Sequence, residues 1–241
     1  MNTPLDLLRL LPLIDWLALA WLFVAWVGYA TFAKHHSDSQ PSLLELTNRI
    51  RRQWMLQATY RENRVFDGVV VQNLSTSPSF FASTTILIIG GLLAVLGTSE
   101  KASELVREIP FAARTTALVF DMKLVLLAGI FVYSFFRFTW SLRQYSFGAL
   151  MVASAPEQFA SLQQREAFAE RAGRVMGLAA ETFNDGLRGY YMSFAVVAWF
   201  FSPVAFIVAT AAVVSVLYWR EFKSDVLELL RNTEKTREPT D

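Results

Sequence analysis

Residues 79–97 of the chain read SFFASTTILIIGGLLAVLG, a run of nineteen residues without a charged side chain. A helix rises about 1.5 Å per residue, so this run nearly crosses a hydrocarbon core of roughly 30 Å, and we predict a membrane span. Four hydroxyls and two adjacent glycines interrupt the apolar run: Ser79, Ser83, Thr84, Thr85, Gly90 and Gly91. Because such residues favour helix–helix contacts, we expect the span to face other helices.

Composition supports a membrane protein. The 241 residues are 54% hydrophobic and 18% charged, whereas soluble domains carry about 25% charged residues. The net charge of +1 and the lack of a basic cluster argue against nucleic acid as a partner. The chain has no cysteine, which excludes disulfides and thiolate chemistry.

Three further apolar segments predict spans at about 13–33, 122–142 and 190–219. The alternative for the first, a cleaved signal peptide, fits poorly because the apolar run is too long. The last segment holds thirty residues, more than a straight span needs, and we expect a kink at Ser202-Pro203. The predicted fold is therefore an all-α integral membrane protein with four transmembrane helices, forming a single domain over 1–220.

Two long polar segments with helical periodicity lie between the spans, at about 42–75 and 157–189. Ser42 is a candidate N-cap of the first. Pro78 follows it, and we expect the next helix to begin or kink there. These segments predict two amphipathic extramembrane helices, and residues 221–241 a polar, partly disordered tail.

Two arginines, Arg61 and Arg64, fall where the stripe of the first polar helix calls for apolar residues. One interpretation is that they snorkel and reach water or lipid phosphate. The other is that they form ion pairs with carboxylates, with Asp67 three residues from Arg64 as the candidate.

The third predicted span carries a polar face at spacings of three and four: Ser134, Arg137, Ser141 and Gln144. A charge inside a span is a functional hypothesis, because at mid-bilayer it costs at least about 2.5 to 3.5 kcal/mol. Arg137 also lies near the polar end of the span, where it can act as an interface anchor. The sequence leaves both roles open.

A small-residue ridge, Ala169, Gly173 and Gly177, lies along the second polar helix. This spacing lets helix backbones approach closely. We interpret the ridge as packing, either onto the 42–75 helix or onto the same helix of a second subunit.

Four spans place both termini on the same side, and positive charge decides which side is cytoplasmic. Loops 34–78 and 143–189 carry eleven lysines and arginines, and the opposite side carries ten, including Lys123 at the start of the third span. From this near tie we favour the two long loops as cytoplasmic, with the termini opposite.

Several strings together resemble one family: RRQWM at 51–55, RENRVFDG at 61–68, IPF at 109–111, FVYSFFRFTWSLRQYSF at 131–147, ASAP at 153–156 and the 79–97 run. They are similar to a four-span family of bacterial membrane proteins with plant relatives, known as domain of unknown function 599. The resemblance implies the fold and an inner-membrane location, and it brings no catalytic motif, cofactor or substrate.

Two functions are consistent with these residues. The first is a homo-oligomeric pore or transporter for small solutes or ions, lined by the hydroxyls of 79–97 and the polar face of the third span. The second is a non-conducting scaffold whose polar helices form a cytoplasmic platform for a protein partner. We expect no enzyme, because the only histidines are the adjacent His35 and His36, and no metal, nucleophile or phosphate-binding motif is present.

Overall fold

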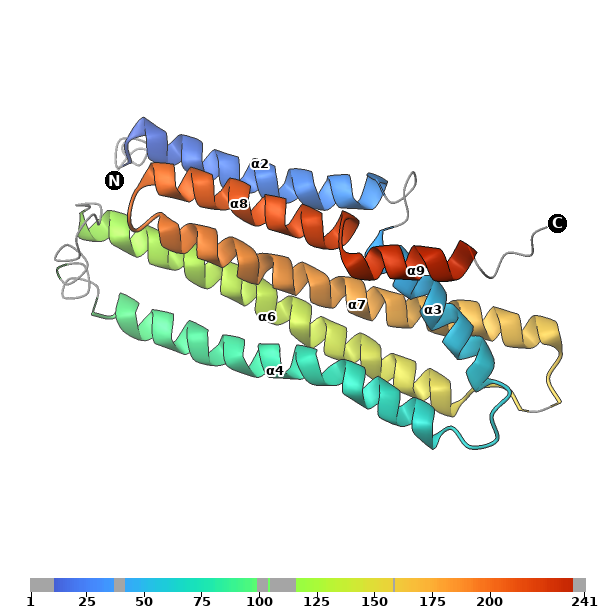
Figure 1. Ribbon diagram of the computed structural model, residues 1–241. Helices are drawn as coiled ribbons and strands as arrows, with labels where there is room; N and C mark the ends of the chain where they lie inside the picture. The colour runs from blue at the N-terminus through green and yellow to red at the C-terminus, as the bar shows by residue number, and fades with distance from the viewer. Residues whose placement is uncertain (1–10, 37–41, 99–103, 105–115, 158, 236–241) are drawn as a thin grey trace. The chain divides into compact units, whose positions relative to one another are not determined.

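The computed structural model describes residues 11–36, 42–98, 104, 116–157 and 159–235. Within these ranges the chain forms helices and no strand, which confirms the all-α fold (Figure 1). The helices are α2 (Leu13–His36), α3 (Leu43–Ala58), α4 (Val65–Leu96), α6 (Ala117–Ala153), α7 (Leu162–Ala198), α8 (Pro203–Phe222) and α9 (Asp225–Lys235).

Four segments are long and apolar enough to cross a membrane: Leu13–Ala33, Val65–Leu96, Ala117–Ala153 and Pro203–Arg231. This confirms the prediction of a multi-pass membrane protein. Residues 99–103 and 105–115, between the second and third of these segments, lie outside the described part of the chain.

The segment predicted as one helix over 42–75 is two helices. Ser42 caps α3, and its Oγ accepts from the Glu45 N–H at 3.2 Å, as predicted. The helix ends at Ala58, and α4 begins seven residues later at Val65, whose N–H donates to the Asn63 side chain at 2.9 Å. Asn63 thus starts a second helix in the middle of the predicted one, because its side chain satisfies a free N–H at the new N-terminus.

Of the two alternatives predicted at Pro78, a helix start or a kink, the helix start is wrong. Pro78 lies inside α4, which is continuous from Val65 to Leu96. A proline there removes one backbone hydrogen bond. Membrane helices tolerate this loss, because neighbouring helices and hydroxyl side chains satisfy the freed backbone groups.

The fourth apolar segment is a helical hairpin and not one kinked span over 190–219. α7 ends at Ala198, three tight backbone bonds run from the N–H groups of residues 199–201 to the carbonyls of residues 196–198, and α8 begins at Pro203. The Ser202 Oγ accepts from the Ala205 N–H at 3.0 Å and caps α8. Ser202-Pro203 therefore starts a new helix, since proline at the first helical position has no N–H to satisfy.

The tail predicted over 221–241 contains regular structure. α8 continues to Phe222, and Asp225–Lys235 forms α9. Residues 236–241 lie outside the described part of the chain.

The chain divides into two compact units where the sequence suggested one domain. Unit 1 contains Met1–Lys34, Thr84–Ser134 and Leu187–Leu217, and unit 2 contains His35–Ser83, Phe135–Gly186 and Tyr218–Asp241. The three longest helices, α4, α6 and α7, contribute residues to both units.

Within the described residues, unit 1 is a bundle of five helical segments, from α2, α4, α6, α7 and α8 (Figure 1). Trp199 is the first residue after α7. It forms hydrogen bonds with Asp15, near the start of α2, and with Lys123, near the start of α6. Earlier in α7, Tyr190 bonds to Thr85 of α4. Accordingly α2, α6 and α8 run away from the Trp199 end of unit 1, and α4 and α7 run towards it. Leu217 and the start of α2 are thus at opposite ends of this unit.

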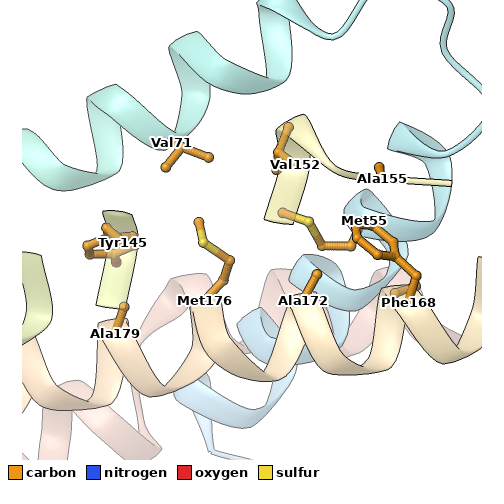
Figure 2. Close-up of a cluster of buried hydrophobic side chains, with 10 residues drawn as sticks. Met55, Val71, Tyr145, Val152, Ala155, Phe168, Ala172, Met176 and Ala179 are labelled. Atoms are coloured by element: carbon orange, nitrogen blue, oxygen red, sulfur yellow. The ribbon is translucent and has the colours of Figure 1, made fainter. Parts of the chain in front are cut away.

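Unit 2 has its own apolar core, built by α3, α4, α6 and α7 (Figure 2). Met55 of α3 and Met176 of α7 are fully buried in it. Figure 2 shows these side chains facing residues of α4 and α6. The other members are Val71, Tyr145, Val152, Ala155, Phe168, Ala169, Ala172 and Ala179. The apolar stripe of the second polar helix therefore has its partner within the same chain.

Candidate functional site

The polar face predicted to line a pore is directed into the protein. Ser134 is buried and donates to the carbonyl of Ile130 at 2.9 Å. Ser141 is buried and donates to the carbonyl of Ala179 on α7 at 2.7 Å. The Oε1 atom of Gln144 is buried without a hydrogen-bond partner among the described residues. Both serine hydroxyls thus use their single donor inside the chain, and of these three groups only the acceptor Oε1 of Gln144 is left without a partner in the described part of the chain.

Arg137 of the same face forms an ion pair with Asp185 of α7. The two side chains are 32% and 20% exposed. Asp185 was not predicted as the partner, because the two residues are distant in sequence and lie on different helices. A guanidinium held by a carboxylate within its own chain is a helix–helix contact rather than a free anchor for lipid phosphate.

The hydroxyls of α4 point in different directions. Thr85 is buried and lies 2.6 Å from the hydroxyl of Tyr190. Ser79 and Ser83 are exposed, and Thr84 is half-buried. The hydroxyl cluster of this span thus divides between an internal contact and an outer face.

The two glycines of α4 do not pack where they were expected to. Gly90 and Gly91 are exposed, and a Cβ added at either would meet no atom within 4 Å outside the local backbone. They lie on a face of α4 that no other described part of this chain covers, so the sequence signal for a close helix contact is not used within the chain.

The Arg61–Arg64–Asp67 group separates into two contacts. Arg61 forms an ion pair with Asp67, which is fully buried and also accepts from the Trp54 indole at 2.7 Å. Arg64 donates instead to the carbonyls of Ala155 and Pro156, at 2.9 and 2.6 Å. Ion pairing therefore applies to Arg61, while Arg64 binds the loop between α6 and α7.

Arg165 makes a matching contact that the sequence did not reveal. This buried side chain of α7 donates to the carbonyl of Thr59 and to that of Ala160 at 3.2 Å. Its guanidinium lies 4.4 Å from the centre of the Tyr60 ring. Arg64 of the α3–α4 loop thus binds the α6–α7 loop, and Arg165, near the start of α7, binds the α3–α4 loop.

The ridge of Ala169, Gly173 and Gly177 packs onto α3 of the same chain. A Cβ at Gly173 would lie 2.5 Å from Cγ and 2.8 Å from Cα of Arg52, and a Cβ at Gly177 would lie 2.9 Å from Oδ1 of Asn48. Since the α3 backbone approaches this closely, only glycine fits at position 173. Of the two partners considered for the ridge, the structure shows the one within the chain.

A second cluster missed in the sequence lies at the Trp199 end of unit 1. Lys123 is 1% exposed, its Nζ donates to the carbonyl of Trp199 at 2.9 Å, and it lies 5.1 Å from the centre of that indole. The indole Nε1 donates to Asp15, which is 6% exposed, at 2.5 Å. A lysine near the start of a predicted span looked like a boundary residue, yet this one closes the turn between α7 and α8.

The described part of unit 2 also contains a cavity of about 310 Å³ around Arg51. Nη1 of Arg51 donates to Thr47 at 3.1 Å and to Asn48 at 2.8 Å. The pKa of the Arg51 guanidinium is lowered from its ordinary value because the side chain is buried. The electrostatic effects of Tyr145 and Glu181 act in the opposite direction and are smaller. Arg51 remains a cation at neutral pH, since arginine titrates far above that range. The other lining residues are Leu43, Leu44, Asn73, Leu74, Ser77, Ala180, Phe183, Asn184 and Glu221.

A family model described as "Protein of unknown function, DUF599" matches residues 17–226. The chain belongs to this family. No curated protein and no solved structure matched it. The match extends over both units, over all of Val65–Leu96 and Ala117–Ala153 and over most of the other two apolar segments. The Arg51 cavity lies within the region that defines this DUF599 protein, as do Lys123 and Trp199, whereas Asp15 precedes it.

Metal binding has no support within the described residues of this DUF599 chain, where no group of three or more histidine, aspartate or glutamate side chains is placed to hold an ion. The groups that remain for chemistry are the arginine cavity of unit 2 and the buried cation of unit 1.

Proposed function

We propose that this protein is a non-conducting scaffold of the bacterial inner membrane, whose polar helices form a cytoplasmic platform that binds a partner. One observation carries the proposal. The polar face that a pore would need, formed by Ser134, Arg137 and Ser141, makes its hydrogen bonds and its ion pair inside the chain. Side chains held in this way are not available to line a path for ions.

The bundle in unit 1 supports five membrane crossings. The α7 segment Leu187–Ala198 holds twelve residues and rises about 18 Å, so a crossing of a core of roughly 30 Å also uses the turns of the continuous helix α7 that precede it. Met192, Ala195 and Val196 are fully buried by the neighbouring segments. The exposed residues Phe194 and Val197 of the same segment are apolar and can face lipid. Hydropathy identifies only the other four segments because most of α7 is polar.

An odd number of crossings places the C-terminal tail with the long loops. The tail from residue 220 carries five of the ten positive residues that the four-span assignment put opposite those loops. If these five residues lie on the same side as the long loops, that side carries sixteen lysines and arginines instead of eleven, and the opposite side carries five instead of ten. The excess of positive charge then favours loops 34–78, loop 143–189 and the tail as cytoplasmic, and the N-terminus as periplasmic.

Sidedness is testable because the chain has no native cysteine. In intact cells, a membrane-impermeant maleimide should label Thr3→Cys and leave the exposed position Glu228→Cys unlabelled until the cells are opened. Labelling of both sites in intact cells would restore the four-span topology and disprove the fifth crossing.

Conduction is tested by flux in liposomes that contain the purified protein. We expect flux of small ions at the level of empty vesicles, for wild type and for Arg137→Ala. Flux above that level in wild type that Arg137→Ala abolishes would refute the scaffold. As a positive test, photo-crosslinkers on exposed positions of unit 2 should capture one defined protein, while the same probes on α8 of unit 1 should not.

An oligomeric pore remains the second candidate because of one observation. Ser79, Ser83 and Gly90 are all exposed on α4, on a face that a second copy can cover. If copies meet there, Ser83→Cys should form a disulfide-linked dimer in membranes and a cysteine at Val125, an exposed residue of α6, should not. A dimer that also carries flux would favour the pore over the scaffold.

A further inference from the structure

We propose that the Arg51 cavity of unit 2 binds a small zwitterion of the amino-acid type, with its carboxylate on Arg51, its ammonium on Glu221 and an aliphatic side chain against the leucines of α3. The proposal adds a ligand site to the protein and is independent of the scaffold function.

The guanidinium supplies the anion-binding part of the site. Among the described residues its hydrogen bonds leave from Nη1 alone, to Thr47 and Asn48, and no carboxylate forms an ion pair with it. The edge formed by Nε and Nη2 has the geometry that binds a carboxylate through two parallel hydrogen bonds. Arg51 differs in this respect from Arg61 and Arg137, which are both paired with aspartates.

The charges around the cavity select a zwitterion over a simple anion. Glu221 lines the cavity together with Arg51, and Glu181 is close enough to favour the charged form of the guanidinium. A phosphate dianion would be repelled by these carboxylates, since like charges in a partly buried site oppose each other. A ligand with one negative and one positive group matches both walls.

Size and polarity narrow the ligand further. A volume of about 310 Å³ is at the lower limit of the range typical of small-molecule sites, about 300 to 1,000 Å³. Leu43, Leu44 and Leu74 provide an apolar wall, and the amides of Asn73 and Asn184 provide hydrogen-bond donors and acceptors. A single aliphatic amino acid satisfies this combination of a small volume, two charges and one apolar surface.

Three probes of nearly equal size separate the contributions of the two charges. L-Leucine carries both groups, 4-methylpentanoate lacks the ammonium, and 3-methylbutylamine lacks the carboxylate. Calorimetric titration of the full chain in detergent should show L-leucine binding at least about tenfold more tightly than either analogue, because each charged hydrogen bond contributes about 1.5 to 3 kcal/mol. Equal affinity for all three, or no binding of L-leucine up to about 10 mM, would overturn the proposal.

Variants assign the effect to the cavity. Arg51→Met should weaken L-leucine binding at least about tenfold. Arg52→Met is the matched control, since Arg52 neighbours Arg51 on α3 but pairs with Glu170 at 3.3 Å and lines a different groove, and it should leave binding unchanged. Glu221→Gln keeps the shape of the site and should reduce the preference for L-leucine over 4-methylpentanoate. This second variant tests the site even if Arg51→Met does not fold. An unchanged preference would disprove the role of Glu221.

Discussion

The buried lysine of unit 1 gives the sharpest test of the structure. In Lys123→Met a thioether of similar length replaces the ammonium. The Trp199 carbonyl then loses its donor, while the indole of Trp199 still donates to Asp15. A hydrogen bond to a charged group contributes about 1.5 to 3 kcal/mol. We therefore expect the free energy of unfolding to fall by about 1.5 to 3 kcal/mol.

The measurement is reversible unfolding by dodecyl sulfate in mixed micelles, followed by far-UV circular dichroism. Lys223→Met is the matched control, because Lys223 also lies over an indole, 5.9 Å from the ring centre of Trp219, but is exposed. An exposed cation–π contact is worth only about 0.5 to 1 kcal/mol. Equal losses in the two variants would refute the buried cluster. The cluster would also be refuted if the losses of unfolding free energy in Lys123→Met and Asp15→Asn simply add in the double variant, since the effects of coupled residues are not additive.

Three further predictions use the same unfolding measurement. Gly173→Ala should lower the free energy of unfolding by about 1 kcal/mol or more through overpacking against the α3 backbone, whereas Gly68→Ala, where an added Cβ meets no atom within 4 Å, should not lower it. Thr85→Val and Tyr190→Phe should each cost about 0.6 kcal/mol, and the double variant should cost no more than either; a fully additive result would show that the two hydroxyls are not bonded. Arg165→Met should lower the free energy of unfolding by about 1 to 3 kcal/mol and speed proteolysis between α3 and α4. An unchanged cleavage rate would contradict the contact of Arg165 with the α3–α4 loop.

Local signals in the sequence determined where helices form and which of them suit a membrane. All but the last residue of the 79–97 run lies inside α4, and the runs at 13–33 and 122–142 lie inside α2 and α6, because apolar length is a property of consecutive residues. Ser42 was identifiable as a cap for the same reason, since its partner is three residues away. The helical periodicity of 157–189 predicted an amphipathic helix, and residues of its apolar face belong to the core of unit 2.

Helix ends that depend on distant partners were not predictable in this way. Ser202-Pro203 was compatible with either a kink in one span or the start of a new helix, and Pro78 was compatible with either a helix start or a helix interior. Proline has the same effect on the backbone in each case, so the surrounding packing decides. At Trp199 the decisive contacts come from Asp15 and Lys123, which lie far away in the sequence.

The sequence alone therefore established an all-helical membrane protein, its apolar segments and the small-residue ridge. Only the tertiary structure decided how its polar groups are used. The same pattern of serines and arginines is consistent with a pore wall or with a helix–helix contact, because periodicity defines a face and not what the face meets. The structure turns the face of Ser134, Arg137 and Ser141 inward and leaves the guanidinium of Arg51, which the sequence did not distinguish from its neighbours Arg49 and Arg52, lining a cavity.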